Sequence, residues 1–267
     1  MASSDAAASL PRLAYVYHPL SFAPLSITEA AQDICRMIWV ADCSDPAVAT
    51  TARLLRKFGP VVDRSQGTLE QVADAVREHA PDGVLSMHDA DLVWTARLAE
   101  LLQLPFHSPD TAVKLTDKHA QREALAAAGL PMPDFRIISG DADAATVDDL
   151  AATFRFPAVL KPREGQSSRD TLPIASGEEL KATVAQLRGR DDATHEDLVL
   201  EGFVPDASEE LGGRGFANFV SVESVVEHGD VQHATISART TFRWPFRETG
   251  YFTPSALSEQ LQAEVLR

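Results

Sequence analysis

Short apolar runs alternate with amphipathic segments over the N-terminal part of the chain. Such runs, rich in β-branched and aromatic residues, predict strands over residues 13–17, 37–41, 60–63 and 83–87. The segments between and after them have helical spacing, which predicts helices over residues 26–37, 45–58, 68–79 and 92–102. We expect Ser26 or Thr28 to cap the first of these helices. This strand–helix alternation predicts a parallel sheet flanked by helices.

The pattern changes in the second half of the chain, where strands and helices no longer alternate regularly. Ser108 followed by Pro109 is typical of a helix start. Further helices are expected over residues 119–128, within 141–149, over 177–187 with Ser176 as cap, and after Pro254. Strands are expected over residues 135–138, at the run that ends on Lys161, over 198–201, and as a hairpin of 217–227 and 231–237.

Composition narrows the class of protein and of partner. Of the 267 residues, 45% are hydrophobic and 24% are charged, which is typical of a soluble globular protein. The formal net charge of −15 disfavours nucleic acid or an anionic membrane as a partner, although a local basic pocket can still hold a phosphate.

Cysteine content and the N-terminal sequence favour a cytoplasmic protein. Cys35 and Cys43 are the only two cysteines, so a disulfide framework and a four-cysteine zinc site are excluded. Residues 1–8 lack the basic and apolar regions of a signal peptide, and we find no apolar run of the roughly 18 residues that span a bilayer. The histidines are scattered without metal-ligand spacing, so we expect structural roles for them and no metal ligand.

One apolar strand followed by a Gly/Ser loop is a candidate phosphate-binding element. Val159 and Leu160 are β-prone, Lys161 ends the run, and Gly165 lets the following backbone approach a ligand closely. An ammonium group beside loop N–H groups can hold a polyphosphate. The same pattern also fits an edge strand that ends in a solvated lysine, and the loop is not a Walker A sequence.

Five short segments, one of which contains Lys161, together carry a resemblance to a known family. They are Thr116–Arg122 with Gly129–Pro133, Pro157–Pro162, Leu198–Val204, Phe219–Val226 and Glu248–Ser255. Each is a weak signal alone. In this order and at these spacings they resemble the ATP-grasp superfamily, in its carboxylate–amine ligase (L-amino-acid ligase-like) branch. The resemblance covers about residues 10–267 and is sharpest over 116–223.

The resemblance implies an α/β fold, with an α+β central part. The expected architecture is the ATP-grasp fold with an N-terminal parallel α/β (pre-ATP-grasp) domain. It also implies three segments: residues 1–110 as that domain, 111–205 as the lid subdomain with both lysines and the adenine linker, and 206–267 as the start of the C-terminal subdomain.

The resemblance also implies how ATP is bound. Lys118 and Lys161 would contact the phosphates, under a lid formed by Gly165, Gln166, Ser167 and Ser168. The adenine linker would be Glu201, Gly202, Phe203 and Val204. Asn218 or Phe219 stands where many family members have the acid that contacts the ribose, and Glu209 or Glu210 is a candidate substitute. Taken alone, Lys118 also fits a helix-start ion pair with Asp117, and Glu201 fits a solvated strand end.

Candidate catalytic residues follow in the C-terminal part of the chain. Arg239 and Arg243, with Arg247 and Glu248, lie among aromatic residues, and a basic patch in an acidic protein fits an anionic substrate or an acyl phosphate. They also fit ordinary surface charges, and Arg163 and Arg169 fit either phosphate contacts or solvation of their loop. Tyr251 occupies the place where the ligase branch usually has histidine.

The expected activity is an ATP-dependent carboxylate–amine ligase that acts on small carboxylate and amine substrates, through an acyl phosphate and with release of ADP. The family implies ATP and Mg²⁺, and by spacing the Mg²⁺ ligands would come after residue 267. We therefore expect either a fragment of a longer ligase or a remainder carried by a separate chain, and we expect this piece alone to be inactive. The resemblance also allows a homodimer. A biotin-carboxylase-type subunit and a non-catalytic nucleotide-binding module are the alternatives.

Overall fold

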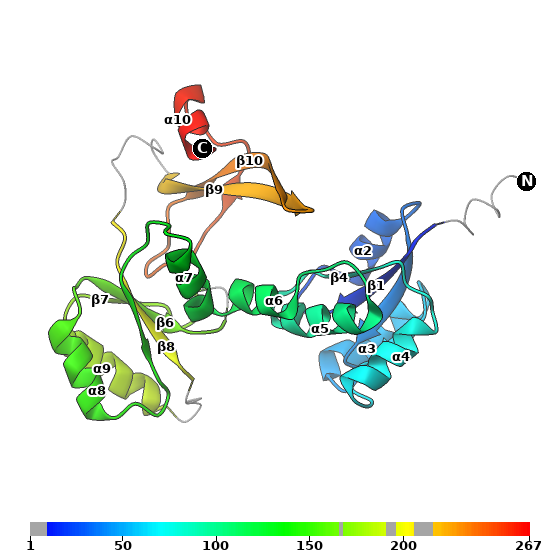
Figure 1. Ribbon diagram of the computed structural model, residues 1–267, viewed down its shortest axis with the longest axis horizontal. Coiled ribbons are helices and arrows are strands. Elements are labelled where there is room, and N and C mark those ends of the chain that lie inside the picture. The colour runs from blue at the N-terminus through cyan, green and yellow to red at the C-terminus, as the bar shows by residue number, and fades with distance from the viewer. Residues whose placement is uncertain (1–9, 166–167, 191–195, 206–215) are drawn as a thin grey trace, which may run out of the picture. The chain divides into compact units, whose positions relative to one another are not determined.

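The computed structural model describes residues 10–165, 168–190, 196–205 and 216–267 (Figure 1). The chain forms two compact units, Met1–Ala124 and Leu125–Arg267, called here the N-terminal and C-terminal units. The division into segments 1–110, 111–205 and 206–267 stays a prediction, because compactness alone does not delimit functional domains.

The N-terminal unit contains the parallel sheet that the sequence predicted. Its strands run in the order β3-β2-β1-β4, and every pairing is parallel. The strands are β1 (Arg12–Tyr17), β2 (Arg36–Ala41), β3 (Val61–Asp63) and β4 (Gly83–Ser86). The helices are α2 (Pro24–Ala31), α3 (Pro46–Leu55), α4 (Leu69–Arg77), α5 (Leu92–Leu102) and α6 (Pro109–Thr116), and a 3-10 turn, η1 (Asp89–Asp91), precedes α5. Helix α7 (Lys118–Ala127) begins in this unit and ends in the next one.

Helices cover both faces of this sheet because successive strand side chains point to opposite sides. Ala14 and Val16 of β1 pack in one core with residues of α4 and α5. Tyr15 and Trp39 belong to a second core with residues of α2 and α3, and their rings meet edge to face at 5.6 Å. Both strands are thus buried on two sides, which accounts for their nearly continuous apolar sequence.

The first helix is shorter than the sequence predicted. It begins at Pro24, with Ala23 rather than Ser26 or Thr28 at the N-cap, and it ends at Ala31 instead of Met37. Pro24 suits the first helical turn, where its missing N–H needs no partner. The residues from Arg36 onward pair with β1, starting at Arg12, so the sheet takes residues that we assigned to the helix.

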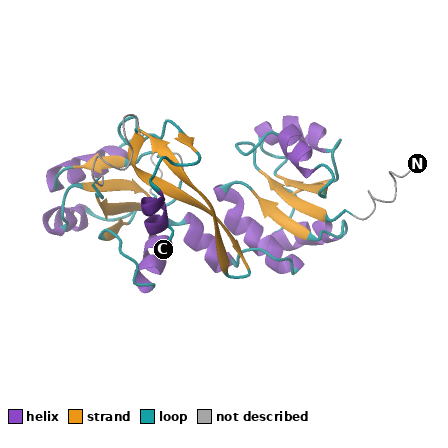
Figure 2. Ribbon diagram, turned by 90° about the horizontal axis from the view of Figure 1, so that it is seen from above, coloured by secondary structure: helices purple, strands orange, loops and turns teal. Residues whose placement is uncertain are grey.

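The C-terminal unit contains two antiparallel sheets. Their strands are among those drawn in orange in Figure 2. The first sheet has the order β5-β8-β6-β7, and the second has the order β11-β10-β9. The strands are β5 (Phe135–Ile138), β6 (Ala158–Pro162), β7 (Leu172–Ile174), β8 (Leu198–Gly202), β9 (Phe216–Glu227), β10 (Asp230–Thr240) and β11 (Tyr251–Phe252). The helices are α8 (Ala144–Thr153), α9 (Gly177–Arg188) and α10 (Glu259–Val265).

Helices α8 and α9 lie side by side and pack on one face of the first of these sheets (Figure 1). Gly177 permits their close approach, because a Cβ there would collide with the carbonyl oxygen of Ala151. Leu160 and Leu200 point into the core beneath the helices and are fully buried. By strand alternation, Lys161 and Glu201 therefore belong to the opposite face of the sheet.

The position of β6 decides one alternative left open by the sequence. This strand pairs with β8 on one side and with β7 on the other, so it is not an edge strand. The edge-strand interpretation of Lys161 was wrong because the short strand β7, which the sequence analysis missed, covers that side. No strand was predicted at β7 because its middle residue is Pro173, and proline is uncommon within strands.

The predicted fold class is confirmed: a parallel α/β unit precedes an α+β part built from antiparallel sheets and helices. The predicted hairpin is also present, with β9 and β10 joined at His228 and Gly229, both of which have positive φ. Among the helices that the structure describes, none is both long enough and apolar enough to cross a bilayer.

Replacing Leu160 by alanine should destabilise the C-terminal unit by about 2–5 kcal/mol, since a buried leucine leaves a cavity. Leu160 is 0% exposed, whereas Leu130, in the same unit, is 52% exposed. The control Leu130→Ala should change stability by less than about 1 kcal/mol. Urea unfolding followed by circular dichroism measures both. Equal losses in the two variants would contradict the core assignment.

Candidate functional site

A buried ion pair lies on the sheet face opposite α8 and α9. The ammonium of Lys161 on β6 contacts Oε2 of Glu201 on β8, and the two side chains are only 16% and 6% exposed. Val159 is the direct cross-strand partner of Glu201, which places Lys161 diagonally across from the carboxylate. Glu201 is therefore not the solvated strand end that the sequence left open.

Burial determines what this pair can do chemically. Attraction between charges is stronger away from water, and a lysine left alone there would lose its hydration without compensation. Glu201 thus holds the ammonium in place at low exposure. Lysine carries three N–H donors, so the same ammonium can contact the carboxylate and an anionic ligand at once.

The loop after β6 is anchored at its beginning. The Arg163 N–H donates to the carbonyl oxygen of Asp197 at 2.9 Å, and the Arg163 guanidinium donates to the Asp197 carboxylate, also at 2.9 Å. The other carboxylate oxygen accepts from the Gly140 N–H at 3.0 Å. Hydrogen bonds from Gly140 and then Arg163 lower the pKa of Asp197 below its ordinary value. Arg163 is therefore engaged within the protein, while the side chain of Arg169 is largely exposed.

Gly165 has the backbone conformation that the loop needs. Its φ of 117° lies in the region that favours glycine, and a Cβ there would have no neighbour within 4 Å. The glycine is required by the turn rather than by packing. Gln166 and Ser167 lie outside the described residues.

The far end of the loop contacts the aromatic segment near residue 246. Ser168 Oγ donates to the carbonyl oxygen of Phe246 at 2.9 Å. The Phe246 ring lies 6.5 Å from that of Phe203 and 5.4 Å from that of Trp244, measured between ring centroids. Residues from the predicted lid, the predicted adenine linker and the arginine-rich segment thus lie together.

The predicted adenine linker is partly engaged by the protein itself. The Gly202 N–H donates to the Asp134 carbonyl at 2.9 Å, and the Phe203 N–H donates to the Pro157 carbonyl at 3.0 Å. Phe203 is 37% exposed and Val204 67% exposed. The backbone available to pair with a base therefore lies at the Val204 end of the segment.

Arg239 on β10 is fixed by several groups of the second sheet. Its guanidinium donates to Ser221 Oγ at 2.8 Å, lies 3.9 Å from Glu223 and 3.8 Å from Glu248, and stacks 5.3 Å from the centre of the Tyr251 ring. Its Nε is buried and has no hydrogen-bond partner within the described part of the chain. A hydrogen bond from Ser221 is the main cause that lowers the pKa of Glu223.

The other predicted catalytic residues are more exposed. Arg243 and Arg247 exchange backbone hydrogen bonds at 2.9 Å in both directions, and their side chains, like that of Glu248, are exposed. The structure therefore brings Arg239 and Glu248 together and places Arg243 in the adjoining turn. Tyr251, where the ligase branch usually has histidine, forms the aromatic surface under Arg239.

Lys118 lies at the start of α7, in the N-terminal unit. Asp117 caps that helix, because its Oδ1 accepts from the N–H groups of His119 and Ala120. Lys161 belongs to the C-terminal unit, so the joint action of the two lysines on one triphosphate stays a prediction. Glu209 and Glu210 lie outside the described residues.

The sequence did not point to Asp197, and it identified Phe246 only as one of the aromatic residues around the arginines. Asp197 is the residue directly before β8, and an acid at the start of a buried strand would have been a signal for an anchor. Phe246 contributes its carbonyl group and ring, and no sequence pattern identifies a backbone acceptor of this kind.

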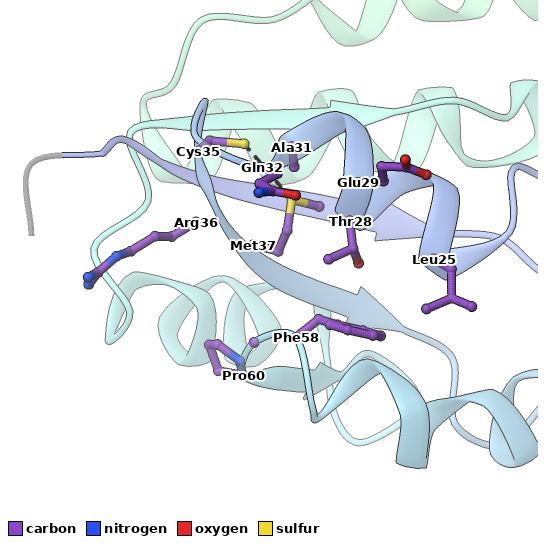
Figure 3. Close-up of a pocket in the computed structure, with 11 residues that line it drawn as sticks. Leu25, Thr28, Glu29, Ala31, Gln32, Cys35, Arg36, Met37, Phe58 and Pro60 are labelled. Carbon is purple, nitrogen blue, oxygen red and sulfur yellow. Dashed lines mark hydrogen bonds between the residues drawn. The ribbon is translucent and has the colours of Figure 1, made fainter. Parts of the chain in front are cut away.

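A separate cavity lies in the N-terminal unit, between α2, β2 and the segment that leads to β3 (Figure 3). Its volume is about 690 Å³, and Met37 and Phe58 form much of its apolar wall, while Arg36 extends away from it. Cys35 lies at its edge and donates to the Met37 sulfur at 4.0 Å. Burial raises the pKa of the Cys35 thiol, which disfavours a reactive thiolate.

Comparison of this sequence with known protein families and curated proteins does not identify a family for the chain. No family model matches the chain. It is 34% identical over 107 residues to the uncharacterized protein y4rH of Sinorhizobium fredii (strain NBRC 101917 / NGR234), a match that covers 40% of this chain and 22% of that protein.

Solved structures identify the fold. An L-amino acid ligase from Bacillus licheniformis matches with 20% identity and a TM-score of 0.67, over 96% of this chain and 57% of that one. N5-carboxyaminoimidazole ribonucleotide synthetase from Thermus thermophilus matches with 20% identity and a TM-score of 0.63, over 95% and 61%. The biotin carboxylase domain of Hydrogenobacter thermophilus 2-oxoglutarate carboxylase, solved with MgADP and bicarbonate, matches with 15% identity and a TM-score of 0.65, over 95% and 55%.

The chain therefore has the fold of these solved structures, as the resemblance to ATP-grasp enzymes predicted. The chain spans between 55% and 61% of the length of these three solved structures, and 22% of the curated relative.

Replacing Asp197 by asparagine should lower the free energy of unfolding at neutral pH by about 1 kcal/mol, because two hydrogen bonds to a carboxylate are weakened. The folded-state pKa of Asp197 is lowered, so its contribution is complete above the ordinary pKa of about 3.9 and is lost as the pH falls through the lower folded value. Urea unfolding of both proteins at a series of pH values measures the difference.

The two proteins should converge in stability at the acid end of that series. The control is Asp149→Asn, which alters an exposed aspartate on α8. A difference for Asp197→Asn that persists unchanged below the folded-state pKa would contradict the role of its charge.

Proposed function

We propose that the protein containing this chain is an ATP-dependent carboxylate–amine ligase that acts on amino-acid or peptide-like substrates. The observation that carries the proposal is the buried Lys161–Glu201 pair, on a central strand directly before a glycine-containing loop. The fold shared with an L-amino acid ligase supports the same reaction class.

Lys161 and Lys118 would neutralise oxygens of the ATP phosphates, while the loop that begins at Gly165 would supply N–H groups. The N–H of Val204 and the carbonyl oxygens near it would pair with the edge of adenine. Such a site contributes mainly by positioning the phosphates and stabilising charge that develops during transfer.

The reaction itself has two steps. A substrate carboxylate oxygen attacks the γ-phosphorus, the bond from that phosphorus to the β,γ-bridging oxygen breaks, and ADP leaves. An amine nitrogen then attacks the acyl carbon, phosphate departs, and the nitrogen loses a proton to give the amide. Arg239, held by Glu248, and Arg243 would stabilise the negative charge of the acyl phosphate.

The family implies Mg²⁺, which would neutralise phosphate charge during transfer. The residues proposed here for ATP do not fit a magnesium site, because the described ones are lysines, neutral donors and Glu201, whose carboxylate is occupied by Lys161.

A biotin-carboxylase-type activity is the second candidate. The fold of the chain is about as similar to such a domain, with a TM-score of 0.65, as it is to the L-amino acid ligase, with a TM-score of 0.67. The two activities differ in what stimulates ATP turnover: amino acids in the first case and bicarbonate in the second. A non-catalytic nucleotide-binding module would bind ATP without releasing phosphate under either condition.

Replacing Lys161 by alanine in the full-length protein should lower kcat for ATP-dependent phosphate release at least about 100-fold, equivalent to about 2.7 kcal/mol of lost charge stabilisation. Phosphate release is measured with a panel of amino-acid pairs and, separately, with bicarbonate. The matched control is Lys181→Ala on α9, whose ammonium pairs with Glu178 at 2.7 Å on the surface, and it should retain full activity.

The single variant leaves Glu201 buried without its partner, which can itself disturb the fold. The double variant Lys161→Ala/Glu201→Gln removes that unpaired charge and should recover stability while it stays inactive. If either variant released phosphate at the rate of the unmodified protein, the assignment of Lys161 would be wrong.

A further inference from the structure

The parallel sheet of the N-terminal unit has one place where its strand order reverses. From β1 the chain adds β2 and β3 on one side of the sheet and then β4 on the other. In open sheets of this kind, ligands bind outside the carboxyl ends of the strands at such a reversal. The reversal here lies between β1 and β4, so the residues after Tyr17 and Ser86 are the ones to inspect.

Four polar residues gather at this edge. His18 directly follows β1, Arg64 directly follows β3, and His88 and Asp91 follow β4. One ligand atom each of His18, His88 and Asp91 lies within 4.8 Å of the others. The sequence predicted scattered histidines with structural roles, and the structure instead brings two of them together.

Asp91 has an unsatisfied oxygen. Its side chain is 5% exposed, and Oδ1 accepts from Arg64 Nη1 at 2.7 Å. Oδ2 is buried and has no hydrogen-bond partner among the residues that the structure describes. A buried acceptor without a donor destabilises the folded state, so this atom points to a missing donor.

The ring geometry does not suit a metal ion. The imidazoles of His18 and His88 are stacked, with centroids 3.5 Å apart and planes only 6° apart. The lone pair of an imidazole nitrogen lies in the plane of its ring, so the lone pairs of two stacked rings lie in two parallel planes. The ligands of one metal ion must instead converge on a single point. In addition, Nδ1 of His18 accepts from the Leu20 N–H at 3.1 Å, and Nδ1 of His88 accepts from the Ala90 N–H at 3.3 Å.

These hydrogen bonds fix the tautomer of the neutral rings. With Nδ1 as acceptor, the proton of each neutral imidazole lies on Nε2, which makes Nε2 a donor. Burial is the main cause that lowers the pKa of His18, which favours this neutral form. The edge therefore combines imidazole N–H donors, a guanidinium and a carboxylate oxygen that needs a donor.

We propose that His18, Arg64, His88 and Asp91 form a binding site for a free amino acid. The ligand ammonium donates to Asp91 Oδ2, and the ligand carboxylate accepts from Arg64 and from His18 Nε2. A zwitterion matches this set because it adds no net charge to the Arg64–Asp91 pair, whereas a simple amine or a simple carboxylate would leave one charge uncompensated.

Arg64 is suited to the carboxylate role. Its side chain is 17% exposed and lies with its Cζ 5.1 Å from the centre of the Trp94 ring, which orients the planar guanidinium. One nitrogen contacts Asp91, and the remaining N–H groups of the fork can donate to a carboxylate. The proposed site is separate from the residues assigned to ATP and does not rest on them.

A ligand can enter through the turn that carries His18. This residue is half-buried and begins a turn in which the Ser21 N–H donates to its carbonyl at 3.0 Å. Leu20 and Phe22, in and beside that turn, are 78% and 59% exposed. Because this turn is exposed, we expect it to move outward when the ligand reaches Oδ2 of Asp91.

The test is isothermal titration calorimetry of the full-length protein without nucleotide, with each of the common L-amino acids as probe. At least one should bind saturably. The analogue of that amino acid without its amino group, and the amine without its carboxylate, should each bind at least 10-fold more weakly. Each of these probes lacks one of the two charges. Asp91→Asn should reduce amino-acid affinity by at least 10-fold and abolish the preference over the analogue without the amino group.

The matched control is Asp89→Asn, which changes an exposed aspartate in the same turn and should bind as the unmodified protein does. If Asp91→Asn does not fold, His18→Phe keeps an aromatic ring for stacking but removes the donor, and it should weaken amino-acid binding at least 5-fold. Thermal unfolding checks that each variant is folded.

The proposal is overturned if no amino acid binds, or if folded Asp91→Asn or His18→Phe binds amino acid as tightly as the unmodified protein. It is also overturned if Zn²⁺ alone binds and both variants abolish that binding. Failure here is distinguishable from failure of the ligase proposal. Amino-acid binding should survive Lys161→Ala, and ATP binding should survive Asp91→Asn.

Discussion

The buried contact between Lys161 and Glu201 is the constraint on which the account of the C-terminal unit depends. Two adjacent central strands bring the charges together on the face that α8 and α9 leave free. Either charge alone would be destabilising at this low exposure, and the opposite charge of its partner compensates for it. The consequence is a lysine held in one position, next to a loop that is tied down at Arg163 and turns at Gly165.

The C-terminal unit also brings together groups that are far apart in sequence. Ser168 and Phe203 both contact Phe246. On the second sheet, Arg239 is oriented by Ser221 and Tyr251, together with Glu248 from the adjoining loop. Donors fixed by their neighbours lose little freedom when a ligand binds, which is what phosphoryl transfer requires of a site.

Local chemistry made much of the fold predictable from sequence. Ser108 with Pro109 predicted the start of α6, and Ser176 predicted the cap of α9. The resemblance to ATP-grasp enzymes supplied the candidate site. Non-local pairing was not predictable: Arg36 pairs with Arg12 and shortens α2, and Leu172 pairs with Leu160 and makes β6 a central strand. The Lys161–Glu201 contact and the His18–His88 stack arise in the same way, from strands that meet only in the fold.

An acyl-phosphate derivative of ATP tests the central claim most directly, because it acylates lysines that lie beside the bound phosphates. The full-length protein is treated with this probe, with and without excess ATP, and modified peptides are identified by mass spectrometry. The account predicts acylation of Lys161 that excess ATP suppresses, with no ATP-dependent change at the surface residue Lys181. ATP-suppressed acylation at other lysines, with Lys161 unmodified, would contradict it.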